Sequence, residues 1–370
     1  MPNTKEADMR NTTTGEAGDR LTIGLDMGDT YTQACVLDED GEVIEESRVS
    51  TTPKAFRRRF ASLPPARIIL EAGGHSHWAS RLLGELGHEV IVANPRMLRF
   101  IYGSDSKNDK ADAAYLARVG KLDPALLHPI VHRSEQSQAD LTLIRSRNAL
   151  VRVRAALVTH VRGLVKVFGT KLPSCATEAF AIKAESQVPE LLRPALEPVL
   201  AIIASLTTQI REFDRKIRAL AKESYPDTSL LSQVGSVGRV TSLAYVLTLE
   251  DPSRFPRARA VGSYLGLRPR QADSGDLKPR LRITKAGDEM LRRLLVECAQ
   301  YLLGPFGRDS DLRRWGLKLV ERGGKSAKKR AVVAVARKLS VLLLRLWQTG
   351  EVYEPLRNAR LRGELTPSPS

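Results

Sequence analysis

Cysteine is scarce in this sequence. The 370 residues include three cysteines, Cys35, Cys175 and Cys298, which lie far apart and match no CxxC or Cys/His metal spacing. An odd number of cysteines cannot all pair within one chain, so a complete disulfide framework is excluded. Each cysteine stands among apolar neighbours, where a thiol behaves as a small buried hydrophobe. The sequence therefore favours a reducing compartment, the cytoplasm.

Long apolar runs are also missing. No stretch of about 18 apolar residues occurs, so we expect no membrane span. Residues 1–20 are polar and contain no hydrophobic signal core, which predicts a disordered N-terminal tail. Residues 349–370, which end in LTPSPS, are predicted to form a second tail.

Acidic residues are outnumbered by basic ones. The chain has 58 Lys and Arg against 42 Asp and Glu, a formal net charge of +16. Such an excess points to a polyanionic partner, and a basic protein that is merely soluble is the alternative. The hydrophobic content of 42% is enough for real cores, and the length predicts two or three domains.

Residues 21–131 alternate between strand and helix patterns. Three consecutive antiparallel strands fit residues 21–50, because the Asp40-Gly41 turn separates two alternating runs. After a basic helix at 53–62, the apolar run RIILEAGG predicts a central buried strand. A helix, a further strand and a helix at 107–122 complete the order β-β-β-α-β-α-β-α. The apolar side of that last helix is predicted to hold Ala111, Ala114, Tyr115 and Leu116.

The middle of the chain, residues 132–226, is predicted to be helical and to link or oligomerise the other domains. Residues 135–167 and 190–222 form two long helical patterns, the first of them rich in arginine. A coiled-coil-like seam of apolar residues recurs at intervals of three and four along the second helix. The seam consists of Leu200, Ile203, Leu206, Ile210, Phe213, Ile217 and Leu220. A helical hairpin of this kind can pack on itself or on another subunit.

Residues 227–348 predict a mostly helical C-terminal domain. Gly235 and Gly238 stand between two helices in the segment QVGSVGR, which resembles a helix-hairpin-helix. Glycines at such a turn allow backbone N–H groups to approach phosphate oxygens, while a tight helix–helix turn is the structural alternative. A basic, loop-rich segment and two long helices follow.

Four carboxylates are candidates for a metal site. Asp26 ends the first predicted strand, Glu71 ends the central one, and Asp109 and Asp112 share one face of a helix at spacing i, i+3. In an open sheet, functional residues gather at strand ends, so the four can converge. Carboxylates that close repel one another without cations, and their hard oxygens suit Mg²⁺ or Mn²⁺. Taken singly, each could instead be a turn, surface or first-turn helix residue.

These segments resemble a known family. IGLDMGDTYTQACVLDEDG, IILEAGGHSHWASRLLGELGHEVIVANP and KNDKADAAYLAR are similar to the N-terminal domain of the DEDD insertion-sequence transposases. This "one-ten" family also includes the Piv-type DNA invertases. The resemblance implies an α/β plus all-α architecture, in which an RNase H/RuvC-like mixed sheet domain precedes a helical hairpin and a helical C-terminal domain. It also implies a metal site at Asp26, Glu71, Asp109 and Asp112, with Mg²⁺ or Mn²⁺ as cofactor.

The C-terminal half resembles the second domain of the same family, through LLSQVGSVGRVTSLAYVLTLEDPSRF and AVGSYLGLRPRQADSGDLKPRLRITKAGDEMLRRLLVECA. There the resemblance implies that Ser274 is a recombinase nucleophile, which attacks a DNA phosphate and forms a phosphoserine bond. From spacing alone, Ser274 is a turn residue, and Ser236 and Ser263 also lie beside glycines.

Basic residues near these motifs are candidates for nucleic-acid contact, since Lys and Arg contacts to phosphates dominate affinity. The candidate set is Gly235, Gly238, Arg268, Arg270, Gly275, Lys278, Arg280, Arg282, Lys325, Lys328, Lys329 and Arg330. A solvated helix face is the ordinary alternative for each lysine and arginine. His75 and His77 follow Glu71, but two histidines in a loop after a strand are more often incidental.

The sequence therefore predicts a DNA transposase or site-specific recombinase of the bacterial cytoplasm, associated with the nucleoid. The resemblance implies double-stranded DNA as substrate, a homo-oligomer (a dimer or a tetramer) and, for some members, a structured guide RNA. Basic helices at 145–166 and 325–338 are candidate RNA contacts. Two alternatives stay open: an actin-like ATPase or sugar kinase, because IGLDMGDTYTQACVLDEDG also resembles its first phosphate loop, and a non-catalytic DNA- or RNA-bridging protein.

Overall fold

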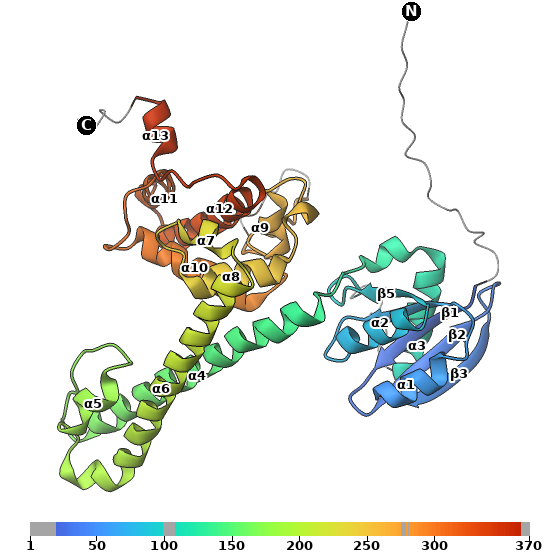
Figure 1. Cartoon of the computed structure of the whole chain (residues 1–370), viewed down its shortest axis with the longest axis horizontal. Helices are drawn as coiled ribbons and strands as arrows, with labels where there is room; N and C mark the ends of the chain where they lie inside the picture. The colour runs from blue at the N-terminus through green and yellow to red at the C-terminus, as the bar shows by residue number, and fades with distance from the viewer. Residues whose placement is uncertain (1–19, 99–107, 275–278, 280, 364–370) are drawn as a thin grey trace, which may run out of the picture. The chain divides into compact units, whose positions relative to one another are not determined.

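A computed structural model describes residues 20–98, 108–274, 279 and 281–363 (Figure 1). The chain divides into two compact units, an N-terminal unit that ends at His132 and a C-terminal unit that begins at Arg133. Each unit has hydrophobic cores of its own. A mixed sheet with helices thus precedes a helical part, as the sequence predicts.

The N-terminal unit is built on a five-stranded sheet with the order β3-β2-β1-β4-β5. Its strands are β1 (Thr22–Met27), β2 (Tyr31–Leu37), β3 (Val43–Ser50), β4 (Arg67–Glu71) and β5 (Glu89–Ala93). Its helices are α1 (Pro53–Phe60), α2 (Ser76–Glu85) and α3 (Asp109–Leu122), and the short 3-10 helix is η2 (Pro124–Leu127). The predicted order of strands and helices is confirmed.

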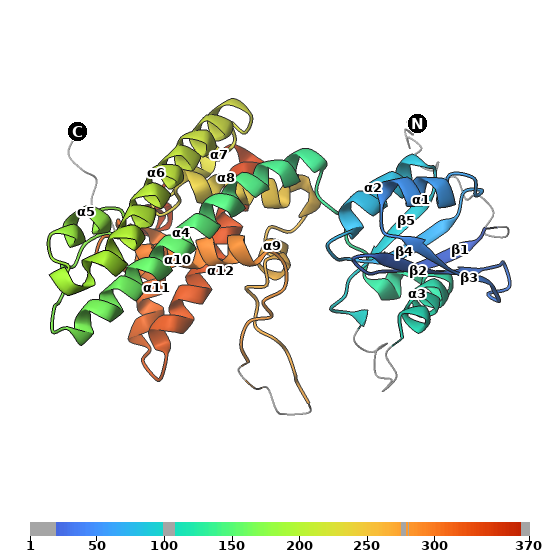
Figure 2. The same ribbon diagram turned by 90° about the horizontal axis from the view of Figure 1, so that it is seen from below.

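The sheet is mixed because of how its strands connect. β1 pairs antiparallel with β2, and β2 with β3, through tight connections, whereas β1 and β4 are parallel, as are β4 and β5. Parallel neighbours need a crossover, and α1 and α2 supply it. Figure 2 shows α1 and α2 on one face of the sheet and α3 on the other. Two of the three interior strands, β1 and β4, are therefore covered on both faces.

The predicted apolar side of α3 is correct in part, because Leu116 is buried and Ala114 is half-buried, and wrong at its other two residues. Ala111 and Tyr115 are exposed, whereas the buried residues of this helix are Ala113, Leu116, Ala117 and Gly120. Apart from Leu116, the buried residues of α3 are small, and they allow the helix to pack closely on the sheet. Amphipathicity read from the size of apolar side chains misses such a face.

The C-terminal unit contains a long helical hairpin, formed by α4 (Glu135–Val167) and α6 (Arg193–Glu223). At its far end, α5 (Phe180–Glu185) and η3 (Glu190–Leu192) complete a small core with the two long helices. The hairpin is not a separate body, because Leu141 and Ile217 near its base belong to the same core as the helices that follow. Figure 1 shows α5 at one end of the hairpin and α8 at the other.

The apolar seam of α6 packs mainly against α4. Leu200, Ile203, Ile210 and Ile217 are buried as expected, whereas Leu206 is only half-buried and Thr207 is buried beside it. By length and composition alone, residues 190–223 are the one segment of the described chain that could cross a membrane. One side of this helix packs against α4, and 22% of its most apolar window is buried in the structure.

The remaining helices surround one large core. They are α7 (Thr228–Ser232), α8 (Arg239–Leu249), η4 (Pro252–Arg254), α9 (Ala260–Tyr264), α10 (Glu289–Leu303), α11 (Asp311–Glu321), α12 (Ala327–Thr349) and α13 (Arg357–Leu361). The buried Tyr245 hydroxyl donates a hydrogen bond of 2.6 Å to the carbonyl oxygen of Ser340, which joins α8 to α12. Where the sequence predicts a tail from residue 349, α13 instead packs on α11. Its N-terminal amides, from Asn358 and Ala359, donate to the carboxylate of Asp311.

Candidate active site

The four predicted carboxylates line one cleft of the N-terminal unit. Asp26 lies near the end of β1, Glu71 is the last residue of β4, and Asp109 and Asp112 lie in the first turn of α3. The cleft encloses about 420 Å³, and its other walls are Met27 and residues 72–76. The structure thus brings together the four side chains that the sequence predicts to converge.

The strand register explains the position of Asp26 beside Glu71. Leu25 pairs with Leu70 across parallel strands, so the two carboxylates occupy the next positions of adjoining strands. Successive side chains of a strand point to opposite faces of the sheet. Because Leu25 and Leu70 lie in the core beneath α1 and α2, Asp26 and Glu71 point to the face covered by α3.

Two glycines bring α3 close to that face. A Cβ atom at Gly24 would overlap the carbonyl oxygen of Ala113, and one at Gly120 would overlap the side chain of Ile69. The helix starts where the Asn108 side chain accepts a hydrogen bond of 3.1 Å from the amide of Lys110. The close packing and this cap together place the first turn of α3 over the strand ends.

The donor set of the cleft suits a hard divalent cation, because it consists of carboxylate oxygens. As the side chains stand, no three His, Cys, Asp or Glu residues within the described ranges approach closely enough to hold a metal ion. Asp109 is exposed, and the other three carboxylates are half-buried. The carboxylates are therefore the right chemical type of ligand for such an ion. Their side chains would have to move closer to one another to bind it.

A histidine at the edge of this cleft has a structural role that the sequence did not reveal. The indole N–H of Trp78 donates to Nδ1 of His75 at 3.1 Å, so Nδ1 is the acceptor and Nε2 carries the proton of the neutral ring. Nε2 lies 3.3 Å from Oδ1 of Asp29. With both ring nitrogens engaged, His75 is a poor metal ligand. His77 stacks on His132, with ring centroids 3.8 Å apart, and does not line the cleft.

In the C-terminal unit, Ser274 is exposed on an extended basic segment between α9 and α10. We call residues 267–274 and 281–286 the serine arm. Its two sides pair through hydrogen bonds of 2.9 Å from the amide of Arg270 to the carbonyl oxygen of Arg282, and from the amide of Thr284 to that of Arg268. Figure 2 shows the arm running away from the helices. Gly275, Lys278 and Arg280 lie outside the described residues.

The base of the serine arm needs glycine at two positions. Gly266 and Gly287 have φ angles of +68° and +71°, the left-handed region that favours glycine. A Cβ atom would overlap Ala286 at the first position and the carbonyl oxygen of Tyr264 at the second. The two sides of the arm therefore leave the helices through one tightly packed crossing.

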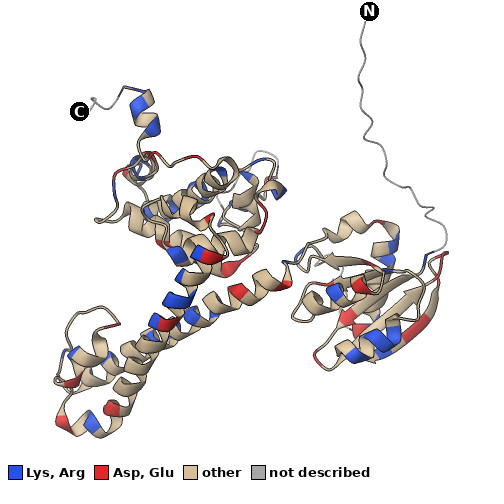
Figure 3. Ribbon diagram, viewed as in Figure 1, with Lys and Arg blue, Asp and Glu red and all other residues tan. Residues whose placement is uncertain are grey.

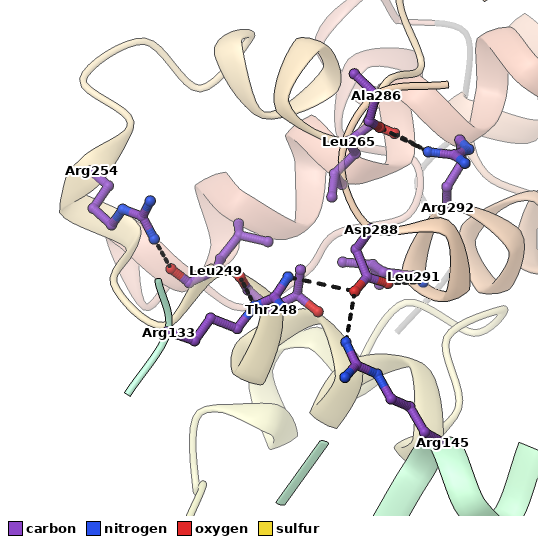
Figure 4. Close-up of polar contacts among 10 residues, drawn as sticks. All are labelled: Arg133, Arg145, Thr248, Leu249, Arg254, Leu265, Ala286, Asp288, Leu291 and Arg292. Carbon is purple, nitrogen blue, oxygen red and sulfur yellow. Dashed lines mark hydrogen bonds and ion pairs between the residues drawn. The ribbon is translucent and has the colours of Figure 1, made fainter. Parts of the chain in front are cut away.

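A buried carboxylate, Asp288, fixes this crossing to the start of the unit (Figure 4). Asp288 caps α10 by accepting a hydrogen bond of 2.9 Å from the amide of Leu291. Its other oxygen lies 3.5 Å from the guanidinium groups of both Arg133 and Arg145. Arg292 donates to the carbonyl oxygen of Ala286 at 2.8 Å and so holds the last residue of the arm. The sequence did not predict this network, because its only local signal is an Asp directly before a helix.

In the segment that resembles a helix-hairpin-helix, one of the two glycines, Gly238, lies at the N-terminus of a helix that has no side-chain cap. This glycine is the N-cap of α8. It lines a groove of about 390 Å³ whose charged residues are Arg211, Arg218, Arg239 and one carboxylate, Asp214. Backbone N–H groups at such a start attract anions. Gly235 is exposed in the preceding turn, outside that groove.

The basic run at the start of α12 is also exposed. Lys328 and Lys329 lie in the first turn of the helix, where cations are disfavoured by the helix dipole and gain from an anionic partner. Lys325 lies in the preceding loop and is likewise exposed. Arg330 instead stabilises that loop by donating to the carbonyl oxygens of Gly323 and Lys325.

The two units differ sharply in charge. Residues 133–370 contain 42 Lys and Arg against 23 Asp and Glu, whereas residues 1–132 contain 16 against 19. Figure 3 shows the basic residues spread over the helices of the C-terminal unit. An acidic cleft on a mixed sheet and a strongly basic helical unit, combined in one chain, are the parts of an enzyme that processes nucleic acid.

Comparison with known proteins identifies the family. A DEDD transposase model of the IS110 group matches residues 23–169, and the model described as "Transposase IS116/IS110/IS902 family" matches residues 228–310. A putative transposase, y4pF/y4sB, of Sinorhizobium fredii is 32% identical over 90% of this chain and 85% of its own. The chain therefore belongs to the IS110 family of transposases, and it is a DNA transposase or recombinase.

Further relatives agree with this assignment. The transposase for insertion sequence element IS1111A of Coxiella burnetii is 28% identical, over 90% of both chains. The pilin gene-inverting protein of Moraxella lacunata is 28% identical over 74% of this chain and 77% of its own. The two family models together cover the four carboxylates of the acidic cleft, the helix α4 and the serine arm. The expectation of a transposase family with invertase relatives is confirmed.

Proposed function

We propose that this transposase cuts and rejoins the ends of an insertion sequence with a RuvC-like metal centre and a serine nucleophile. The observation that carries the proposal is the convergence of Asp26, Glu71, Asp109 and Asp112 on one cleft. Strand order, the face of the sheet and the position of α3 also fit a RuvC-like domain. Relatives named for insertion-sequence transposition and for pilin gene inversion support DNA strand exchange as the reaction.

The four carboxylates would hold divalent cations, Mg²⁺ or Mn²⁺. When bound, such ions stabilise negative charge on the attacking and leaving oxygens of a phosphodiester. The contribution of the protein is the set of hard oxygen ligands. The sheet fixes two of them and the first turn of α3 presents the other two.

Ser274 would supply the nucleophile. Its hydroxyl oxygen attacks the phosphorus of the scissile phosphodiester, a phosphoserine bond forms, and the bond to one DNA oxygen breaks. The serine proton is lost to solvent or a nearby base, and the leaving DNA oxygen takes up a proton to become a hydroxyl. In the second step a DNA hydroxyl attacks the phosphoserine and releases the serine. The exposed position of Ser274 on the serine arm supports this role.

Basic residues of the arm would bind the flanking phosphates. Arg268, Arg270 and Arg282 are exposed on its paired sides. Guanidinium groups offer planar, bidentate donors that match phosphate oxygens. We propose further contacts at Gly238 and at the start of α12, with double-stranded DNA of the element ends and target as substrate. Action on chromosomal DNA implies association with the bacterial nucleoid.

Oligomerisation and a structured guide RNA are further parts of the proposal. Because one strand exchange joins two DNA partners, a dimer or tetramer is the expected assembly, with the helical hairpin as the candidate contact between subunits. The arginines of α4 at residues 145–166 and the basic start of α12 are the candidate contacts to RNA.

The deciding experiment traps the covalent intermediate. A DNA end carrying a nick next to the scissile phosphate prevents the second step, and the protein–DNA adduct is then mapped by mass spectrometry. We expect the adduct on Ser274 and its loss in Ser274→Ala, while Ser224→Ala, a matched change at the exposed end of α6 and outside the arm, keeps it. An adduct on another residue, or recombination by Ser274→Ala at the wild-type rate, would contradict the proposal.

A further inference from the structure

A groove of about 700 Å³ lies beside α12 in the C-terminal unit, and its lining includes neither the acidic cleft nor the serine arm. Arg337, Val341 and Arg345 of α12 line one side of it. They are four residues apart and therefore share one face of the helix. The other side is formed by residues 257–260 and by Ser263 of α9. Among the described residues, four arginines and no acidic residue line this groove; the arginines are Arg257, Arg259, Arg337 and Arg345.

These groove arginines have no carboxylate partner within the described part of the chain. Neighbouring arginines are used by the fold itself. Arg254 donates a hydrogen bond of 3.1 Å to the carbonyl oxygen of Leu249 and stacks on Tyr264. Arg357 pairs with Glu351 at 3.1 Å. The groove arginines therefore differ from their neighbours in presenting their charge to solvent together.

One of the four is held in place by backbone packing. A Cβ atom at Gly262 would approach Cγ of Arg337 to 3.0 Å, so the glycine leaves room for the arginine stem to lie across α9. Arg337 is accordingly half-buried, whereas Arg257, Arg259 and Arg345 are exposed. A long arginine stem that packs against the fold tends to keep its charged head at the surface, where it can meet an anion.

We propose that the four groove arginines form a second nucleic-acid contact surface, which binds successive backbone phosphates and reads no base edges. Guanidinium groups are suited to phosphate oxygens by their planar, paired donors. Arg337 and Arg345 are eight residues apart on α12, about 12 Å along the helix axis. That distance spans several phosphates of a strand whose rise is about 3.4 Å per nucleotide. The surface would hold nucleic acid away from the reacting phosphate.

Salt dependence of binding tests the proposal directly. Affinity of the full chain for a 40-base-pair duplex is measured by fluorescence anisotropy in EDTA, across a range of salt concentrations. Each phosphate contact contributes about 0.9 to the slope of log K against log salt concentration. We expect the double variant Arg337→Gln/Arg345→Gln to reduce that slope by roughly 1 to 2 and to weaken binding at least about tenfold at low salt.

A matched control separates this site from a general loss of charge. Arg357→Gln/Arg360→Gln removes the same two charges, but from arginines that are paired with Glu351 and Glu354. We expect it to change the slope by well under 1. Equal slopes for the two double variants, with both folded by circular dichroism, would overturn the proposal.

A second measurement of the same kind determines whether the bound phosphates belong to DNA or to RNA. A structured RNA hairpin replaces the duplex, and loss of slope with DNA, with RNA or with both supports the site and identifies its ligand. An unchanged slope with both overturns it. Because binding is measured in EDTA, no strand cleavage or covalent step contributes to the measured affinity. Failure of the proposed catalytic mechanism would therefore leave this test unaffected.

Discussion

The guanidinium of Arg133 lies 3.5 Å from the carboxylate of Asp288, residues that are 155 positions apart in the chain. Arg133 is the first residue of the C-terminal unit, and it also donates to the carbonyl oxygen of Thr248 at 3.1 Å. Asp288 caps α10 directly after the serine arm. The pair therefore ties the entry of the chain into this unit to the base of the arm that carries Ser274.

Replacing that carboxylate is expected to destabilise the C-terminal unit. Asp288→Ala removes a helix cap, which typically costs about 1 kcal/mol, and leaves Arg133 largely buried without its partner. We expect a total loss of about 2–3 kcal/mol in the free energy of unfolding, measured by urea denaturation. The matched change Asp309→Ala breaks an exposed pair with Arg314 and should cost at most about 1 kcal/mol. Equal losses would show that Asp288 is not a structural anchor.

The close packing of α3 on the sheet makes Gly24 a sensitive position. Gly24→Val should push α3 away from β1, because the added atoms overlap the backbone at Ala113. We expect a loss of at least about 2 kcal/mol in stability, with weaker metal binding because Asp109 and Asp112 move too.

Gly84→Ala is the control for this prediction. Gly84 is an exposed helical position in α2, and a Cβ atom added there would meet nothing within 4 Å. Alanine there should leave stability unchanged or raise it by up to about 1 kcal/mol. Calorimetry that ranks the two variants in the opposite order would refute the packing argument.

Metal binding by the acidic cleft can be measured without DNA. Mn²⁺ affinity is followed by isothermal titration calorimetry, and Asp26→Asn is expected to weaken it by more than about tenfold, since even residues that only support a ligand contribute that much. Asp29→Asn, a change to an exposed acid outside the cleft, should bind Mn²⁺ as the wild type does. If Asp26→Asn binds Mn²⁺ with wild-type affinity, Asp26 is not a ligand of the proposed metal site.

Stability of the C-terminal unit should depend on pH through Glu250. Burial alone would raise the pKa of this carboxyl, but hydrogen bonds from Ser134 and Ser137 and the charge of Arg133 outweigh it, so the pKa lies below its ordinary value of 4.5. A lowered pKa in the folded state means that the stabilisation is present above pH 4.5 and is lost as the pH falls through the folded-state pKa. Thermal melting of Glu250→Gln should therefore show a weaker loss of stability below pH 4.5 than the wild type does. Identical acid profiles would exclude this residue as a source of the dependence.

Much of the N-terminal unit could be predicted from local pattern. Alternation, the Asp40-Gly41 turn and the apolar run of β4 determine the strand order, because each reflects a periodicity within a few residues. The family could also be predicted from the sequence, because the four carboxylates lie in three segments that resemble the family's motifs. The side of α3 that packs on the sheet could not be predicted fully. Gly24 and Gly120 allow the helix to lie close to the strands, and the spacing of apolar residues does not reveal this contact.

In the C-terminal unit, the sequence specified long helices but not how they share a core. The sequence predicts residues 132–226 as a linking or oligomerising region, and only the structure shows that Leu141 and Ile217 pack with helices far along the chain. The helix α13 was missed for the same reason, because its cap is supplied by Asp311, 47 residues from Asn358. Contacts at such separation depend on the whole packing arrangement.

The sequence by itself determined which carboxylates and which serine are candidates, because residue type and local order carry that chemistry. The tertiary structure alone decided that Asp26 and Glu71 face α3, since parallel register and close helix packing are properties of paired strands. It also decided which arginines support the fold and which present their charge to solvent. That distinction depends on where each guanidinium finds a carbonyl or carboxylate oxygen.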